Sequence, residues 1–166
     1  MITIISGINR KGSTTGKIAR QYKQLLKNKG LETSIVDLED TDFLQRSTAF
    51  ETMESERLAP ADKYIFISPE YNGSIPGALK LMIDQTNYRK TWPGKKALLV
   101  GVSTGRAGNL RGMDHLASIL NHLGVQVHPN HLPISQIDKL MNGTDEIRET
   151  NTLKAIDEQI NEFIGF

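Results

Sequence analysis

The sequence has no cysteine among its 166 residues. This absence excludes a disulfide framework, thiolate zinc or iron–sulfur ligation and a thiol nucleophile, and it fits the reducing cytoplasm where we expect the protein. Long apolar runs are also missing, because the longest are Tyr64–Ile67 and Ala97–Val100, far short of the ~20 residues that a membrane helix needs. The start, from Met1 to Ser6, lacks the basic segment of a signal peptide. We therefore expect a soluble, uncleaved protein without a membrane partner.

Charge of one sign is not in excess either. Twenty Lys and Arg residues stand against nineteen Asp and Glu, which leaves a net charge of +1 and gives no reason to expect a nucleic-acid partner. With 38% hydrophobic residues the chain can build one sizeable core. No repeat, linker or low-complexity run divides the sequence. We expect a single domain over residues 1–166.

Short apolar runs alternate with stretches in which apolar residues recur at helical spacing. We predict strands at residues 2–5, 33–36, 61–68, 96–102 and 125–127. We predict helices between residues 14 and 29, at 48–56, 78–85 and 109–122, and around residues 153–163. Such alternation indicates a doubly wound parallel α/β sheet with helices on both faces. Ligands of these sheets bind outside the carboxyl ends of the strands, where the loops after strands one, three and four meet.

Loop one (residues 6–16) combines hydroxyl groups and cations directly before a helix. Arg10 and Lys11 precede Ser13, Thr14 and Thr15. Backbone amides and the positive end of a helix dipole favour an anion at such a place, and hydroxyls and a guanidinium add donors. Ser13 stands where a Walker A loop has its lysine, and the pattern G-x-G-x-x-G is absent, so a monophosphate fits better than a triphosphate or a dinucleotide. The alternative is an ordinary helix cap at Ser13 or Thr14.

Loop two (residues 69–80) and loop three (residues 103–112) have features that suit a flat ligand. Asn72-Gly73 favours a tight turn with positive φ, and Tyr71 offers an aromatic face beside it. In loop three the glycines allow close approach of the backbone to a ligand, and Arg106 and Arg111 add charge for an anionic cosubstrate. The alternatives are a rigid loop with Tyr71 as packing at its rim, and a flexible connector.

These loops carry a resemblance to a known family. Loop two, PEYNGSIPGALK, is similar almost without a break to the signature of the NADPH-dependent FMN reductase family. Loop one resembles the family pattern G-S-x-R-x-x-S-x-N through Gly7, Arg10 and Ser13, and departs from it at Ile8, where the family has serine, and at Thr15, where it often has asparagine. Loop three resembles the family less tightly. The resemblance runs from the start of the chain to about residue 127.

The resemblance implies a flavodoxin-like three-layer sandwich whose five-stranded parallel sheet has the order 2-1-3-4-5. It implies FMN as cofactor and NAD(P)H as cosubstrate, with the FMN phosphate in loop one and the isoalloxazine between loops two and three. Asn9 is the polar residue that could replace the hydroxyl missing at Ile8. The residues placed at the cofactor in this way are Asn9, Arg10, Ser13, Thr14 and Thr15 in loop one, Pro69, Glu70, Tyr71, Asn72, Gly73 and Ser74 in loop two, and Ser103, Thr104 and Gly105 in loop three.

The implied activity is transfer of hydride from NAD(P)H through the flavin to a quinone, azo dye, metal oxyanion or free flavin. The cofactor supplies this chemistry, so no catalytic acid or base is predicted. The resemblance also implies a homodimer or tetramer, with residues 78–85 and 109–122 as the expected contact. One alternative is a flavodoxin-like electron carrier without NAD(P)H activity, and a weaker one is a phosphate-ester or nucleotide binder that uses loop one alone.

Other conspicuous residues are expected to be structural. We predict that His115, His122, His128 and His131 are surface or partly packed residues rather than metal ligands, because no carboxylate stands at a telling spacing. Trp92 either stacks on a cosubstrate or fills the core under a loop. The acidic stretch 37–56, with Asp40, Asp42, Glu51, Glu54 and Glu56, is expected to be a solvated face.

Overall fold

The computed structural model describes residues 1–39, 43–141 and 143–166. Its strands are β1 (Ile2–Ser6), β2 (Thr33–Asp37), β3 (Lys63–Pro69), β4 (Lys96–Val102), β5 (Gln126–Val127) and β6 (Leu132–Ile134). Its helices are α1 (Thr14–Asn28), α2 (Thr48–Met53), α3 (Gly77–Gln85), α4 (Tyr88–Thr91), α5 (Leu110–His122), α6 (Ile137–Met141) and α7 (Thr150–Gly165), with a π-helical turn, η1 (Glu54–Leu58), directly after α2.

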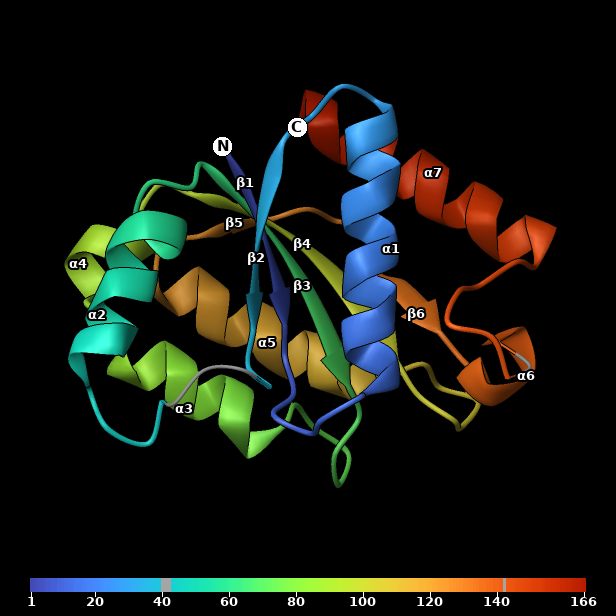
Figure 1. Ribbon diagram of the computed structural model, residues 1–166, viewed down its shortest axis with the longest axis horizontal. Coiled ribbons are helices and arrows are strands. Elements are labelled where there is room, and N and C mark those ends of the chain that lie inside the picture. The colour runs from blue at the N-terminus through green and yellow to red at the C-terminus, as the bar shows by residue number, and fades with distance from the viewer. Residues whose placement is uncertain (40–42, 142) are drawn as a thin grey trace.

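The sheet is parallel throughout, and its strand order is β2-β1-β3-β4-β5. In the centre, Ile4 of β1 lies beside Ile35 of β2 and Ile65 of β3. Helices cover both faces, with α1 and α7 on one side and α3 and α5 on the other (Figure 1). The predicted flavodoxin-like, doubly wound architecture and its strand order are confirmed.

The near-continuous apolar runs of the central strands follow from burial on both faces. Along β3, Tyr64 and Phe66 pack into the core formed with α3 and α5. Ile65 and Ile67 point to the opposite face and pack with α1 and α7. All four side chains are fully buried. Successive residues of one strand therefore hold two helix layers against the sheet, and this fixes the sheet edge at which the loops meet.

The fifth position of the sheet differs from the prediction of one strand at 125–127. It is occupied by two short strands, β5 and β6, which pair with β4 at its start and at its end. Pro129 lies in the interval, and a proline has no amide hydrogen to donate to a strand ladder. The return of the chain as β6 gives structure to part of the segment 128–150, for which no role was predicted.

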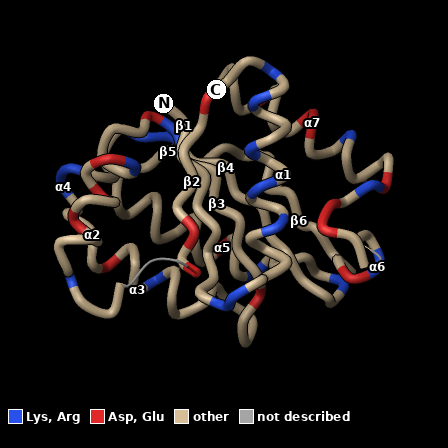
Figure 2. Tube along the Cα trace, in the orientation of Figure 1, with Lys and Arg blue, Asp and Glu red and all other residues tan. Residues whose placement is uncertain are grey.

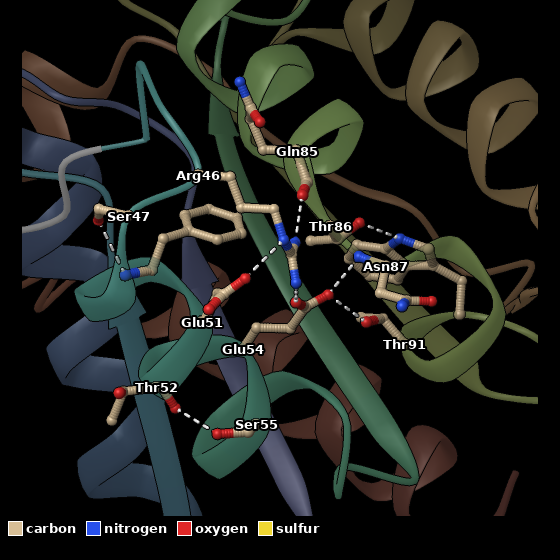
Figure 3. A network of polar contacts seen from close by, with 12 residues as sticks. Arg46, Ser47, Glu51, Thr52, Glu54, Ser55, Gln85, Thr86, Asn87 and Thr91 are labelled. Carbon is tan, nitrogen blue, oxygen red and sulfur yellow. Dashed lines mark hydrogen bonds and ion pairs between the residues drawn. The ribbon is translucent and has the colours of Figure 1, made fainter.

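The segment around α2 contains a buried carboxylate that the sequence analysis placed on a solvated face. Glu54 is 5% exposed. Its Oε2 accepts a hydrogen bond from Arg46 Nη2 at 2.7 Å, and its Oε1 accepts from Thr91 Oγ1 at 2.8 Å and from the Asn87 amide (Figure 3). A buried charge is stable when it is paired and its lone pairs are satisfied, as they are here.

The network corrects the expectation for the acidic stretch at Glu54. Arg46 also donates to the carbonyl oxygen of Gln85 at 2.6 Å, so it joins α2 to the end of α3. Glu51 and Glu56 are exposed, as expected of a solvated face. Asp40 and Asp42 lie outside the described residues.

Trp92 fills the core under the loop between α4 and β4. Its side chain is fully buried, and its ring lies 5.2 Å from the ring of Tyr64. Its indole N–H donates to Thr86 Oγ1 at 2.7 Å. This confirms packing, rather than cosubstrate stacking, as the role of Trp92. Among the helices of the described residues, none has the length and apolar character of a membrane-crossing segment.

Candidate functional site

The loops that follow β1, β3 and β4 meet at one edge of the sheet, at the lower end of the strands in Figure 1. They enclose an open cavity of about 660 Å³, within the size range of small-molecule sites. Twelve of the fourteen predicted site residues line it, namely Arg10, Ser13, Thr14, Thr15, Pro69, Glu70, Tyr71, Asn72, Gly73, Ser103, Thr104 and Gly105. Asn9 and Ser74 do not line it.

Five further residues complete the wall, and they are not among the fourteen predicted from the sequence. They are Ile8, Lys11, Gly12, Val102 and Ile137. Four of these are in or beside loops that the sequence singled out. Ile137 begins α6, far along the chain, and reaches the cavity because its amide donates to the Ser103 carbonyl oxygen at 3.1 Å. No sequence pattern indicated that approach.

Loop one begins with a close passage of the backbone over the sheet. The Gly7 amide donates to the Ile67 carbonyl oxygen at 2.8 Å, and a Cβ at Gly7 would lie 2.9 Å from Leu79 Cδ2. A side chain at this position would require the buried Leu79 side chain or loop one itself to shift. The family pattern has glycine here for a reason that the packing makes explicit.

The turn into α1 is capped by Ser13. Its Oγ accepts a hydrogen bond from the Gly16 amide at 3.0 Å, which is the geometry of a helix N-cap. The cap leaves the hydroxyl proton of Ser13 able to donate into the cavity. Among the described residues, the hydroxyls of Thr14 and Thr15 make no hydrogen bond, although Thr15 is 3% exposed. Three hydroxyls thus converge on one wall of the cavity near the positive end of the α1 dipole.

Loop two contains the predicted tight turn. Tyr71 and Ser74 exchange two backbone hydrogen bonds, at 2.9 and 3.0 Å. Asn72 and Gly73 between them have φ values of 51° and 74°. Positive φ at both central residues is the signature of a type I′ turn, which Asn-Gly favours. Tyr71, Asn72 and Gly73 of this turn all line the cavity.

Side chains from other elements fix this turn. Ser74 Oγ lies 2.8 Å from Nδ1 of His115 on α5. A Cβ at Gly73 would lie 3.0 Å from Nη1 of Arg111, so this arginine packs against the turn. Arg10 places its guanidinium carbon 5.7 Å from the centre of the Tyr71 ring, a cation–π contact between loops one and two. Ser74 therefore does not line the cavity itself but helps to hold the turn that does.

Loop three is tied to its surroundings rather than being a flexible connector. Ser103 Oγ accepts from the Gly108 amide and donates to the Gly105 carbonyl oxygen, both at 3.1 Å. The Gln136 amide also donates to the Gly105 carbonyl oxygen, at 3.0 Å. Arg106 is exposed and does not line the cavity.

A second anchor of loop three is the buried Asn109. It has a left-handed backbone, with φ of 64°, and its side-chain amide donates to the Ser68 carbonyl oxygen at 2.9 Å. The bond joins the start of α5 to the end of β3. Loops two and three are thereby held on a common frame.

The charges at this sheet edge are of both signs (Figure 2). Arg10 and Lys11 line the cavity, whereas Asp37 and Glu39 lie at the end of β2, beside loop one. Burial raises the pKa of the Asp37 carboxyl above its ordinary value, although hydrogen bonds from the Glu39 amide and Ser6 act against the rise. Among the described residues, no three His, Asp or Glu side chains are grouped so as to hold a metal ion.

These features define a flavodoxin-like α/β protein with a cavity at the switch point of its sheet, where such proteins bind ligands. The model of the NADPH-dependent FMN reductase family matches residues 1–139. The chain belongs to this family of oxidoreductases, whose cofactor is FMN and whose electron donor is NAD(P)H.

Individual relatives agree with this assignment. The chain is 33% identical over 150 residues to an NAD(P)H-dependent FMN reductase of Pseudomonas aeruginosa, which covers 85% of this chain and 79% of that protein. It is 29% identical over 177 residues to a quinone reductase of Escherichia coli strain K12, covering 100% and 94%. The solved structure of FerB, a flavoenzyme NAD(P)H:(acceptor) oxidoreductase from Paracoccus denitrificans, superposes with a TM-score of 0.84 at 22% identity over 99% of this chain and 94% of that one.

The cavity residues fit FMN in the chemistry of their donors. A phosphate needs hydroxyl, amide and cationic donors, and loop one supplies the hydroxyls of Ser13, Thr14 and Thr15 together with Arg10 and Lys11. A planar heterocycle with polar edges needs a flat, narrow slot with backbone groups at its rim. Tyr71, the Asn72-Gly73 turn and Gly105 are the lining residues that supply an aromatic side chain and backbone groups of this kind.

Proposed function

We propose that this protein is an FMN-binding oxidoreductase that takes hydride from NAD(P)H and reduces a small quinone. The observation that carries the proposal is that hydroxyls and cations of loop one line the same cavity as Tyr71, the Asn72-Gly73 turn and Gly105 of loops two and three. The quinone class is supported by the quinone reductase among the relatives, whose alignment covers 100% of this chain and 94% of that protein. When bound, FMN would supply the hydride chemistry.

In this proposal the protein binds and orients the cofactor as one domain spanning residues 1–166. Arg10, Ser13, Thr14 and Thr15 hold the phosphate, and the exposed Asn9, which does not line the cavity, neighbours them in loop one. Pro69, Glu70, Tyr71, Asn72 and Gly73 border the ring on one side, with Ser74 supporting them, and Ser103, Thr104 and Gly105 border it on the other. No side chain is assigned as acid or base, because hydride transfer to a stacked flavin requires a clear ring face rather than a proton donor of the protein.

The first experiment is the absorption spectrum of the purified protein and its titration with FMN. We expect the purified protein to show the absorption bands of a flavin. If it is purified without colour, we expect it to bind added FMN in the titration. NADH and NADPH are then tested as electron donors with a benzoquinone as acceptor under steady-state conditions. Failure to bind FMN would contradict the proposal. Bound FMN that neither nucleotide reduces would instead favour the electron carrier.

We also propose that the protein forms a homodimer or tetramer through α3 and α5. A groove of about 570 Å³ lies between these helices, lined by Ile83, Ile119 and Leu123 among others. Tyr88 also lines this groove and leaves 52% of its surface exposed. Light scattering coupled to gel filtration tests this, with Tyr88→Glu as the variant expected to give monomers and Arg89→Glu as its neighbouring control.

A further inference from the structure

Loop one donates one of its backbone amides to a carboxylate of the chain itself. The Gly12 amide nitrogen lies 2.9 Å from Oε2 of Glu39, which is two residues beyond the end of β2. Gly12 is part of the cavity wall and has φ of +65°. An anion in loop one would therefore find this donor already engaged by a negative charge from the neighbouring strand.

The end of β2 holds Glu39 in this position. The Glu39 amide donates to Asp37 Oδ1 at 3.3 Å, which closes a local turn. The Asp37 side chain is only 10% exposed. Asp37 in turn lies 3.6 Å from Nη1 of Arg20 on α1. The segment that carries Glu39 is thus fastened to the same helix whose N-terminus loop one precedes.

The position of Glu39 matters for an anion because of its charge. A phosphate monoester carries between one and two negative charges near pH 7, and a carboxylate at the same amide opposes it. Ile8, where the family pattern has a serine, adds no donor, because its side chain is apolar and 3% exposed. Loop one therefore has one hydroxyl fewer than the family pattern and one amide that a carboxylate occupies.

We propose that Glu39 is a specificity-determining residue that competes with the phosphate of the flavin for the Gly12 amide. This inference rests on the proposed function, because it concerns the phosphate of FMN in loop one. The carboxylate must leave the amide before the phosphate binds, so FMN loses part of its advantage over riboflavin, which has no phosphate. The same competition speeds the release of FMN, because the carboxylate returns to the amide as the phosphate departs.

The test compares FMN with riboflavin in the apoprotein and in two variants. Glu39→Ala removes both the charge and the acceptor, whereas Glu39→Gln keeps the acceptor and removes the charge. Glu32→Gln is the matched control, because it makes the same charge change at an exposed position at the other end of β2. Dissociation constants are measured by flavin fluorescence and calorimetry, and FMN release by stopped flow. Circular dichroism establishes that each variant is folded.

We expect both Glu39 variants to bind FMN about tenfold more tightly and to release it more slowly, which corresponds to one charge-assisted contact. The affinity for riboflavin should stay within about twofold of that of the original protein. Glu32→Gln should change the affinity for neither flavin. Unchanged or weaker FMN binding in both Glu39 variants overturns the inference while flavin binding itself stands. Equal tightening for riboflavin also overturns it. If neither flavin binds any of the four proteins, the proposed function fails, and the inference fails with it.

Discussion

Gln159 of α7 completes the hydrogen bonding of β4 at Leu99. Its side-chain amide donates to the Leu99 carbonyl oxygen at 3.1 Å and to the Asn130 carbonyl oxygen at 2.8 Å. Leu99 lies in the part of β4 that faces neither β5 nor β6. A helix side chain thus takes the place of a missing strand residue. Because Gln159 donates to both carbonyl oxygens, neither is left without a partner where the fifth position of the sheet is split.

Replacing Gln159 by Leu should destabilise the protein strongly. Gln159 also accepts a hydrogen bond from the buried Tyr22 hydroxyl at 3.0 Å, so the change leaves two buried polar groups, at Tyr22 and Leu99, and the part-buried Asn130 carbonyl without this partner. At about 1–3 kcal/mol for each such group, we expect the free energy of unfolding to fall by about 3 kcal/mol or more in urea denaturation. Gln24→Leu, at an exposed position of α1, should change it by less than about 0.5 kcal/mol. A loss at Gln159 no greater than at Gln24 would contradict the role assigned to the network.

Arg10→Ala should weaken FMN binding much more than riboflavin binding. Removal of a charge-assisted bond to phosphate costs roughly 1.5–3 kcal/mol, which is about tenfold or more in the dissociation constant. The contact of Arg10 with the Tyr71 ring adds a smaller loss of about 0.5–1 kcal/mol that both flavins share. Fluorescence titration measures both affinities, with the exposed Arg106→Ala as control. Equal losses for the two flavins would show that Arg10 does not contact the phosphate.

His115→Ala should weaken the binding of FMN and of riboflavin by a similar factor. The hydrogen bond between Ser74 and His115 holds the turn of loop two, which we assign to the ring rather than to the phosphate. Its loss should cost about 0.5–1.5 kcal/mol, or roughly a two- to twelvefold increase in both dissociation constants. Ser74→Ala should have the same effect, and the double variant should be no worse than either single one. Asn121→Ala, exposed on the same helix, serves as control.

Asp37→Asn should stabilise the protein at neutral pH, with a gain that shrinks in acid. Burial raises the pKa of Asp37 in the folded state above its value in the unfolded chain, so the folded protein holds the proton more tightly. That contribution to stability is complete below the unfolded pKa, near 3.9, and is lost as the pH rises through the folded pKa. Urea denaturation from pH 3 to pH 7 measures the difference between variant and original protein. A difference that does not grow with pH would contradict the shift.

Local sequence determined strands β1 to β4, and the resemblance to the family supplied the strand order and most of the residues of the cavity wall. Continuous runs of apolar, often β-branched residues mark β1, β3 and β4, because these strands are buried on both faces. The Asn72-Gly73 turn was also readable, because a positive φ at two successive residues restricts the choice of amino acid. Once parallel pairing is known, the meeting of loops one, two and three follows from the geometry of a doubly wound sheet.

Tertiary structure alone decided the contacts between residues distant in the chain. Four features depend on how separate elements pack. They are the place of Ile137 in the cavity wall, the hydrogen bond between His115 and Ser74, the contact of the Glu39 carboxylate with the Gly12 amide, and the burial of Glu54. Neither spacing nor composition encodes them, because a side chain's partner across the fold is set by the sum of the packing and not by its neighbours in sequence. The sequence by itself indicated the sheet edge at which the cavity lies, and the packing decided which charges lie around that cavity.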